Sequence, residues 1–367
     1  MKIIIVNLHP QDALGGSEIQ CDIFAKKLTE LGHNVIYLAI NGKGEYKKPY
    51  TVIPTDFCSK IIAETTIKEN PDIVYWRINR KKFRNSVKPI KKAGIKIVFA
   101  FSSNTNTKKW LGFGERRSNE SIIRYIAKSL IRNIKVRYNH TGLKWVDGIT
   151  VNNESHLNKL NFNPQIYIPN SNIIDFVPFS WKKPFICWVA NLKTNKRPEL
   201  CLELAKMINN QDIDILIVGK IQDSNYLYFR NKNNLTANLY YLGPKTVTEV
   251  NGIIKSSICL IHTCKTEGFP GNFIQAWLQG KPVVSYEYDP GELIRSEELG
   301  FVSDGDMDNF ANDVKKLIED EELRNTLGKR AQLFANKNFH PETNTKKLES
   351  FLKDIVNNKR TMTENIK

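Results

Sequence analysis

Residues 258–285, ICLIHTCKTEGFPGNFIQAWLQGKPVVS, contain two short apolar runs with a loop and a helical segment between them. Ile258–Ile261 and Pro282–Ser285 have the length and the apolar character of buried strands. Between them, a Gly- and Pro-rich loop precedes a helix that we expect Asn272 to cap. The helix should run to Gln279 and be ended by Gly280 with Pro282. A strand, a helix and a second strand in this order predict one unit of a parallel sheet that is covered by helices.

The same alternation of apolar runs and amphipathic segments recurs along the whole chain. In addition to the two strands above, we expect strands at Lys2–Val6, Asn34–Ala39, Ile73–Trp76, Ile95–Ala100, Gly148–Val151, Phe185–Val189, Ile213–Val218 and Leu239–Leu242. Almost fully apolar strands that alternate with helices are typical of parallel sheets buried on both faces. Because the alternation restarts after residues 170–184, we predict an α/β fold of two doubly wound domains, 1–170 and 171–338. Ligands of such folds bind beyond the carboxyl ends of the strands, here in the cleft between the domains.

The composition is that of a soluble globular protein, with 41% hydrophobic and 25% charged residues. No run approaches the ~18 apolar residues that a membrane-spanning helix needs, and the apolar run near the N-terminus is too short for a signal peptide. The six cysteines are scattered, without a CxxC pair. We therefore expect free thiols in a reducing cytosol, and neither a zinc site nor a disulfide framework.

The net charge of +16 is concentrated in the first half of the chain. Residues 1–170 hold 28 Lys and Arg against 13 Asp and Glu, whereas residues 171–367 hold 26 against 25. Such a surplus attracts anionic lipid headgroups, polyphosphate substrates or nucleic acid. A solvated face without a partner is the alternative. No nucleic-acid recognition motif accompanies the basic residues, so we do not expect a nucleic-acid partner.

Two loops that follow predicted strands carry groups suited to phosphate. Gly15 and Gly16 follow the first strand and precede a helix, whose N-terminal N–H groups can bind an anion. Lys193, Lys196 and Arg197 lie in a loop after the first strand of the second half, where cations suit a diphosphate. A purely structural Gly-Gly turn and ordinary surface lysines are the alternatives.

One acid stands out in the quoted segment. Glu267 lies in a loop whose backbone is constrained by Gly268, Pro270 and Gly271, next to the N-terminus of the predicted helix. Backbone donors there suit phosphate or sugar oxygens. Eight positions later the chain has an amide, Gln275, which can accept and donate hydrogen bonds but carries no charge.

The segment EGFPGNFIQAWLQGKPVVS resembles the signature of the retaining glycosyltransferases of family 4, which have the GT-B architecture of two facing Rossmann-like domains. Further segments resemble family segments in the same order: GGSE at 15–18, GLKWVDGITVNNES at 142–155, IYIPNS at 166–171, WVANLKTNKRPEL at 188–200 and NLYYLGPKTVTEVNGIIKSSICLIHT at 238–263. The likeness spans nearly the whole chain. It also implies that the amphipathic helix within 339–367, with Leu348, Phe351, Leu352 and Ile355 on one face, crosses back to the N-terminal domain.

The resemblance implies a UDP- or GDP-sugar donor bound mainly by the second domain, an acceptor bound by the first, and no metal ion or other cofactor. Glu267 and Lys196 are then the catalytic residues: Glu267 contacts the donor sugar and Lys196 neutralises the diphosphate. Gln275 takes the position of the acid that holds the ribose. The implied donor-binding residues are Gly15, Gly16, Asn191, Lys193, Lys196, Arg197, Glu267, Gly268, Phe269, Pro270, Gly271, Asn272 and Gln275.

The sequence departs from the family pattern at three places. Gln275 replaces the second acid, and Ala190-Asn191 replaces a Gly-Arg pair, so that Lys193 or Arg197 has to supply the missing cation. The first-domain strand that often ends in a His reads IVFAFSSNTNT here, which leaves no catalytic His to assign. His9, after the first strand, is the nearest substitute, but a structural role is the simpler interpretation.

We therefore expect a retaining hexosyltransferase that acts on a saccharide or lipid-linked saccharide, in bacterial surface polysaccharide assembly. A non-catalytic homologue that serves as a binding or assembly partner is the alternative. The expected location is cytoplasmic, with peripheral contact to the inner face of the plasma membrane. The predicted helix Ser121–Lys144 combines isoleucines with basic residues, so it either lies on a membrane surface or packs on its own sheet.

Overall fold

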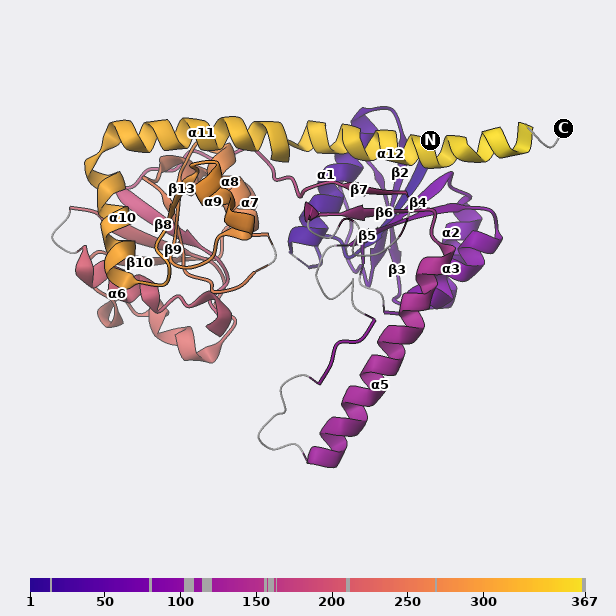
Figure 1. The fold of residues 1–367 in the computed structure, drawn as a ribbon, viewed down its shortest axis with the longest axis horizontal. Helices are drawn as coiled ribbons and strands as arrows, with labels where there is room; N and C mark the ends of the chain where they lie inside the picture. Colours follow the sequence, from indigo (N-terminus) through magenta and orange to yellow (C-terminus); the bar gives the residue numbers. More distant parts are fainter. Residues whose placement is uncertain are drawn as a thin grey trace. The chain divides into compact units, whose positions relative to one another are not determined.

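The computed structural model describes residues 1–364, except for 14, 79–80, 102–108, 114–120, 155–156, 158–161, 163, 209–211 and 268. The chain divides into two compact units (Figure 1). Unit 1 comprises Met1–Ser171 and Pro341–Lys367, and unit 2 comprises Asn172–His340. Each unit is a parallel sheet with helices packed on it, so the predicted α/β class is confirmed.

Unit 1 has a seven-stranded sheet in the order β3-β2-β1-β4-β5-β6-β7. Its strands are β1 (Lys2–Asn7), β2 (Asn34–Ile40), β3 (Thr51–Thr55), β4 (Ile73–Trp76), β5 (Lys96–Phe101), β6 (Gly148–Val151) and β7 (Gln165–Tyr167). Its helices are α1 (Gly16–Glu30), α2 (Ser59–Glu69), α3 (Phe83–Lys92), α5 (Ile122–His140) and α12 (Pro341–Glu364). The five strands predicted in this half are present within a residue at each end, and β3 and β7 are additional.

Unit 2 has a six-stranded sheet in the order β10-β9-β8-β11-β12-β13. Its strands are β8 (Phe185–Val189), β9 (Asp214–Val218), β10 (Leu239–Gly243), β11 (Leu260–His262), β12 (Val283–Ser285) and β13 (Gly300–Val302). Its helices are α6 (Leu200–Met207), α7 (Val247–Ser256), α8 (Gly271–Leu278), α9 (Leu293–Ser296), α10 (Met307–Glu319) and α11 (Glu321–Phe339). Apolar clusters cover both faces of this sheet, as they do in unit 1.

The strand order reverses direction once in each sheet. In unit 1, β1 lies between β2 and β4, and in unit 2, β8 lies between β9 and β11. Adjacent connections leave the sheet on opposite sides at such a point, which opens a crevice at the carboxyl ends of the strands. The segments after β1, β8 and β11 therefore occupy the positions where a doubly wound sheet binds its ligands.

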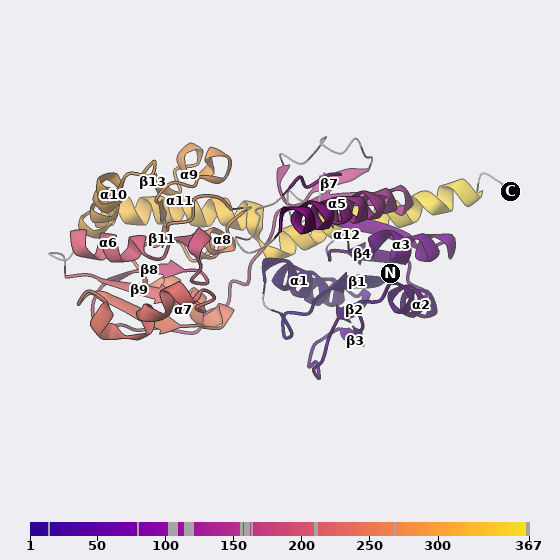
Figure 2. The same ribbon diagram turned by 90° about the horizontal axis from the view of Figure 1, so that it is seen from below.

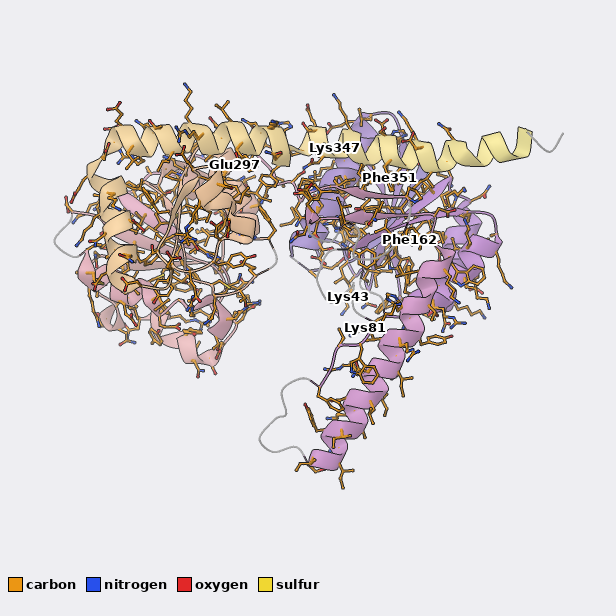
Figure 3. The ribbon with its side chains drawn as sticks, viewed as in Figure 1. Lys43, Lys81, Phe162, Glu297, Lys347 and Phe351 are labelled. Atoms are coloured by element: carbon orange, nitrogen blue, oxygen red, sulfur yellow. The ribbon has the colours of Figure 1, made fainter. Side chains whose placement is uncertain are left out.

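The last helix, α12, packs on unit 1, where it lies beside α1 in both views of the ribbon (Figures 1 and 2). Its buried apolar side chains, Leu348, Phe351, Leu352 and Ile355, share one cluster with those of β1, β2 and α1. Phe351 is labelled on α12 in Figure 3. At Gly148 a Cβ would come within 2.4 Å of Ile355 Cδ1 and 3.0 Å of Phe351 Cζ. The glycine thus lets α12 lie directly on β6. None of the described helices has both the length and the hydropathy that a bilayer-spanning segment requires.

Candidate functional site

The loop between β11 and α8 carries Glu267, the predicted acid. This loop follows the carboxyl end of β11, which lies next to β8 where the strand order reverses. The prediction that Asn272 caps the helix is wrong, because α8 begins at Gly271 with Pro270 at the N-cap position. Asn272 lies in the first turn instead, and its Nδ2 donates to the Val189 carbonyl at 2.9 Å. This bond ties the start of α8 to the end of β8 and so joins the two loops of the site.

Glu267 is held between a cation and an imidazole. Lys196 Nζ contacts Glu267 Oε1, and His262 Nε2 lies 3.4 Å from Oε2. Burial raises the pKa of Glu267, but the His262 hydrogen bond and the Lys196 charge outweigh it and lower the pKa to about 2. The carboxylate is therefore charged at neutral pH and has a fixed orientation.

His262, the last residue of β11, is a site residue that the sequence reasoning missed. It is buried, and burial lowers its pKa, so the ring is neutral near pH 7. Ser285 Oγ, 3.4 Å from Nδ1, donates its hydrogen to the Tyr288 carbonyl at 2.6 Å. An ionised carboxylate can only accept, so the contact with Glu267 is the reason to assign the proton of the neutral ring to Nε2. In the sequence, its place at the end of the strand that precedes Glu267 could have identified it as a site residue.

The predicted cations after β8 have different surroundings. Thr263 joins this loop to β11, since its hydroxyl donates to the Lys196 carbonyl at 2.6 Å and its carbonyl accepts from Arg197 Nε at 2.7 Å. The Arg197 guanidinium also pairs with Glu287 at 3.0 Å. Lys193 forms no ion pair among the residues that the structure describes. The structure thus brings Lys196 to Glu267 and directs Arg197 toward Glu287.

The amide at position 275 is explained by its neighbour Asn251. This side chain is fully buried, and its Nδ2 donates to the carbonyls of Ile173 and Asp175, both at 2.8 Å. Its Oδ1 therefore points to Gln275, whose Nε2 donates to it at 2.9 Å. A carboxylate at position 275 would face this oxygen without a proton to share. The amide matches the acceptor that the chain places beside it.

The other predicted residues of unit 2 have mainly structural contacts. Asn191 is exposed, and its Oδ1 accepts from the Lys220 backbone N–H at 3.2 Å, which holds the loops after β8 and β9 together. The Phe269 ring packs against Trp277 and Phe339, with centroids 6.3 and 5.3 Å away. Phe269 is thus a packing residue of the α8 side of the sheet. The predicted Gly268 lies outside the described residues.

Gly15 and Gly16 lie in unit 1, at the start of α1. Gly15 is the N-cap with extended backbone, and Gly16 is the first helical residue. A Cβ at Gly15 would come within 2.4 Å of Glu18 Oε2, while a Cβ at Gly16 would meet no atom within 4 Å. Burial raises the pKa of Glu18. The space next to Gly16 is therefore open, whereas the Glu18 carboxylate lies next to Gly15. Both glycines lie at the positive end of the α1 dipole.

His9 has the surroundings of a structural residue. It is fully buried, and its Nε2 lies 3.2 Å from the Tyr50 hydroxyl, which in turn donates to Asp22. Burial, followed by the Lys48 charge, lowers the pKa of His9 to about 4. The second expectation about a histidine concerned the end of β5, where no catalytic His could be assigned. That position corresponds to Ser102 and Ser103, which lie outside the described residues.

Among the described residues, His262, Cys264 and Glu267 place possible metal ligands within 4.8 Å of one another. The group fits a divalent cation poorly, because Lys196 already contacts a Glu267 oxygen. Burial also raises the pKa of the Cys264 thiol, so that this group holds its proton. The arrangement suits an anionic ligand next to Lys196 and hydroxyl donors next to Glu267.

Residues 171–334, nearly all of unit 2, match the family model for glycosyl transferases group 1. An uncharacterised glycosyltransferase of Methanocaldococcus jannaschii is 25% identical over 150 residues, which make up 40% of this chain and 38% of that protein. The chain thus matches about two fifths of the length of this curated relative.

Solved structures resemble the chain over nearly its full length. A sucrose-phosphate synthase of Thermosynechococcus elongatus has a TM-score of 0.73 at 14% identity and covers 97% of this chain and 99% of its own. Anabaena HepE in complex with UDP and glucose has a TM-score of 0.71 at 16% identity, with 96% and 100% covered. A glycosyltransferase of Rickettsia africae has a TM-score of 0.73 at 18% identity, with 97% and 98% covered. At these identities the likeness concerns the fold, and the predicted GT-B fold is confirmed.

Proposed function

We propose that the protein is a retaining glycosyltransferase of family 4 that transfers a hexose from a UDP- or GDP-sugar without a metal ion. The observation that carries this proposal is the contact between Lys196 and Glu267, with His262 behind the carboxylate. The contact lies after β8 and β11, the two strands at the reversal point of unit 2. The same unit matches the group 1 glycosyl transferases.

The chemistry of sugar transfer suits these side chains. The bond between the anomeric carbon and the diphosphate oxygen breaks, and the acceptor hydroxyl oxygen bonds to the same carbon. The hydroxyl loses its proton to the departing diphosphate or to solvent, and the nucleoside diphosphate leaves with increased negative charge. A fixed ammonium such as that of Lys196 stabilises this charge without reorganisation. The N-terminal N–H groups of α8 add to the effect. Glu267, which is kept ionised, accepts hydrogen bonds from the sugar hydroxyls and orients the anomeric carbon.

Gln275 has a narrower role in this proposal than an acid would have. Its Nε2 is used by Asn251, so it offers Oε1 to a ribose hydroxyl. Such a bond between neutral groups is weaker than one to a carboxylate. We therefore assign to Gln275 the orientation of the ribose, and to Lys196 most of the electrostatic stabilisation.

For the acceptor, we propose a saccharide linked to a lipid diphosphate, on the inner face of a bacterial plasma membrane, in surface polysaccharide assembly. The basic surplus of residues 1–170 supports this choice, since it attracts both a diphosphate and an anionic surface. HepE, one of the solved relatives by fold, was crystallised with UDP and glucose, which agrees with a UDP-sugar donor in this fold class.

The experiment that tests the proposal is thermal unfolding with UDP, GDP, ADP and CMP, and with their sugar conjugates, in the presence of a chelator. A ligand at 100 times its Kd adds about 2.7 kcal/mol of stability. We expect one nucleotide to raise the Tm and its sugar conjugate to raise it further. The additional rise should vanish in Glu267→Ala.

A non-catalytic homologue is the second candidate, and it is favoured by the departures at Gln275 and Asn191. Under that interpretation, no nucleotide changes the Tm, or nucleotides bind while Glu267→Ala behaves as the wild type does with every sugar conjugate. Either result would contradict the proposed donor site.

A further inference from the structure

Helix α5 of unit 1 buries polar side chains and exposes apolar ones, the reverse of an ordinary surface helix. Its two buried residues are both polar, Ser129 and Asn133. Ile123 is 82% exposed and Ile134 is 63% exposed. Figure 1 shows α5 extending away from the strands of unit 1, with its N-terminal end farthest from them. A helix that packs on its own sheet has the opposite pattern, so that alternative from the sequence is wrong.

The attachment of α5 to unit 1 lies near the C-terminal end of the helix. The Tyr138 hydroxyl donates to Asn85 Oδ1 at 2.8 Å, and the Arg84 guanidinium lies 4.5 Å from the centre of the Tyr138 ring. Along the middle of the helix, Asn133 binds the backbone of Leu111 and Gly112 at 2.7 and 3.0 Å. The buried polar residues Ser129 and Asn133 thus face the protein, while the isoleucines of the strip described next remain exposed.

The exposed side chains of α5 fall on two adjacent strips. With 3.6 residues per turn, the apolar strip is formed by Ile123, Ile126, Leu130, Ile131 and Ile134, all more than 40% exposed. The strip beside it carries Arg124, Lys128, Arg132 and Lys135. Basic residues beside an apolar helix face are typical of helices that lie at a bilayer surface.

We propose that α5 is a docking helix that lies flat in the headgroup region of an anionic lipid bilayer. The helix contains no Asp or Glu, so its charge complements that of anionic lipid. A second copy of the chain would bring two such basic strips together, which disfavours pairing through this face. The 19 residues of α5 span about 28 Å, and the helix lies along the surface instead of crossing it.

This inference extends the proposed lipid-linked acceptor, but it rests on α5 itself. Docking through α5 holds unit 1 at the surface where a lipid-linked saccharide is found. If the protein binds vesicles and no nucleotide, the proposed function fails and the docking helix stands. If it binds a sugar nucleotide and no vesicle, the docking helix fails and the donor site stands.

The test is sedimentation of the full-length protein with vesicles of phosphatidylcholine alone and of phosphatidylcholine mixed with phosphatidylglycerol. We expect binding to the mixed vesicles only, and weaker binding as salt concentration rises. The double variant Ile123→Ser/Ile134→Ser should bind at least about 10-fold more weakly, because two isoleucines no longer enter the lipid. Arg124→Gln/Lys135→Gln should weaken binding to the anionic vesicles.

Leu333→Ser, which changes a 64% exposed leucine of α11 in unit 2, is the matched control and should bind as the wild type does. The substitutions in α5 replace exposed side chains, so circular dichroism should show an unchanged fold. Failure of the wild type to bind mixed vesicles, or equal binding by the isoleucine variant, would overturn the proposal. A wild-type dimer that the isoleucine variant dissociates would assign the face to self-association instead.

Discussion

The Lys196 ammonium contacts the Glu267 carboxylate, so two side chains from the loops after β8 and β11 neutralise each other. The lysine side chain is 13% exposed and the glutamate side chain 27%. In the proposed reaction this pair opens toward a donor: the diphosphate takes the cation, and the sugar hydroxyls take the carboxylate. Since each partner is already fixed, little reorganisation accompanies the chemical step.

Lys196→Met tests the cation. The variant keeps the length of the side chain but removes the ammonium group that would pair with the diphosphate. We therefore expect the preferred nucleoside diphosphate to bind more weakly, by at least about 2 kcal/mol of binding free energy. Titration calorimetry with the nucleoside diphosphate measures the loss. Lys265→Met, on the same loop as Glu267 but 69% exposed, is the control and should retain the wild-type affinity. Equal losses in both variants would argue against a specific role for Lys196.

His262→Leu tests the positioning of Glu267. Loss of the Nε2 donor frees the carboxylate to rotate, so we expect the donor-sugar KM to rise and kcat to fall by about 10-fold each. The affinity for the nucleoside diphosphate alone should stay the same, because that ligand does not need Glu267.

His262→Gln is the conservative variant, since its amide can donate to the same oxygen, and it should recover part of the activity. A role in packing alone would lower the Tm of both variants and leave the ratio of sugar conjugate affinity to nucleotide affinity unchanged.

Gln275→Glu tests the pairing with Asn251. The new carboxylate faces Asn251 Oδ1, which Asn251 cannot turn away without losing its bonds to two carbonyls. We expect the free energy of unfolding at pH 7 to fall by about 1–3 kcal/mol. The protonated carboxyl can donate, so its pKa is raised in the folded state and the deficit should shrink as the pH falls toward 4.

Urea unfolding at pH 7 and pH 4 measures this difference. Gln222→Glu, at an exposed position, adds the same charge and should show no comparable deficit. A Gln275→Glu protein as stable as the wild type at pH 7 would show that Asn251 does not specify the amide.

The pH dependence of stability has a distinct contribution from His9. Burial lowers its pKa from 6.5 to about 4, so the unfolded chain binds the proton more tightly. The contribution to stability is complete above pH 6.5 and is lost as the pH falls from 6.5 toward 4. At pH 5 the loss is about 2 kcal/mol. Unfolding curves for wild type and His9→Gln at pH 8 and pH 5 measure it: the variant should lack this part of the acid sensitivity, and an identical pH dependence would contradict the assignment.

The sequence was sufficient for the buried part of the fold. Strands such as β1, β4 and β9 are apolar runs within the core, and their positions were predicted to within a residue or two. β3 and β7 lie at the two edges of the first sheet, and β13 lies at an edge of the second. All three are short and only partly buried, so they lack the apolar run that marks a central strand.

The site was only partly predictable, for a different reason. Glu267 and Lys196 were each singled out by local pattern and resemblance, but their direct contact joins residues 71 positions apart. Asn251 and His262 act through partners that the local sequence does not reveal. The same holds for α5, whose composition was evident while its exposed side depends on what the rest of unit 1 leaves uncovered.

The measurement that tests the central claim most directly is ³¹P NMR of UDP- and GDP-sugars with the protein, a chelator and a bacterial lipid extract as acceptor. The proposal predicts that one donor is converted to its free nucleoside diphosphate over time, and that Lys196→Met and Glu267→Gln abolish most of this conversion. If the wild type binds a sugar nucleotide but releases no nucleoside diphosphate from any donor, the protein is not the proposed transferase.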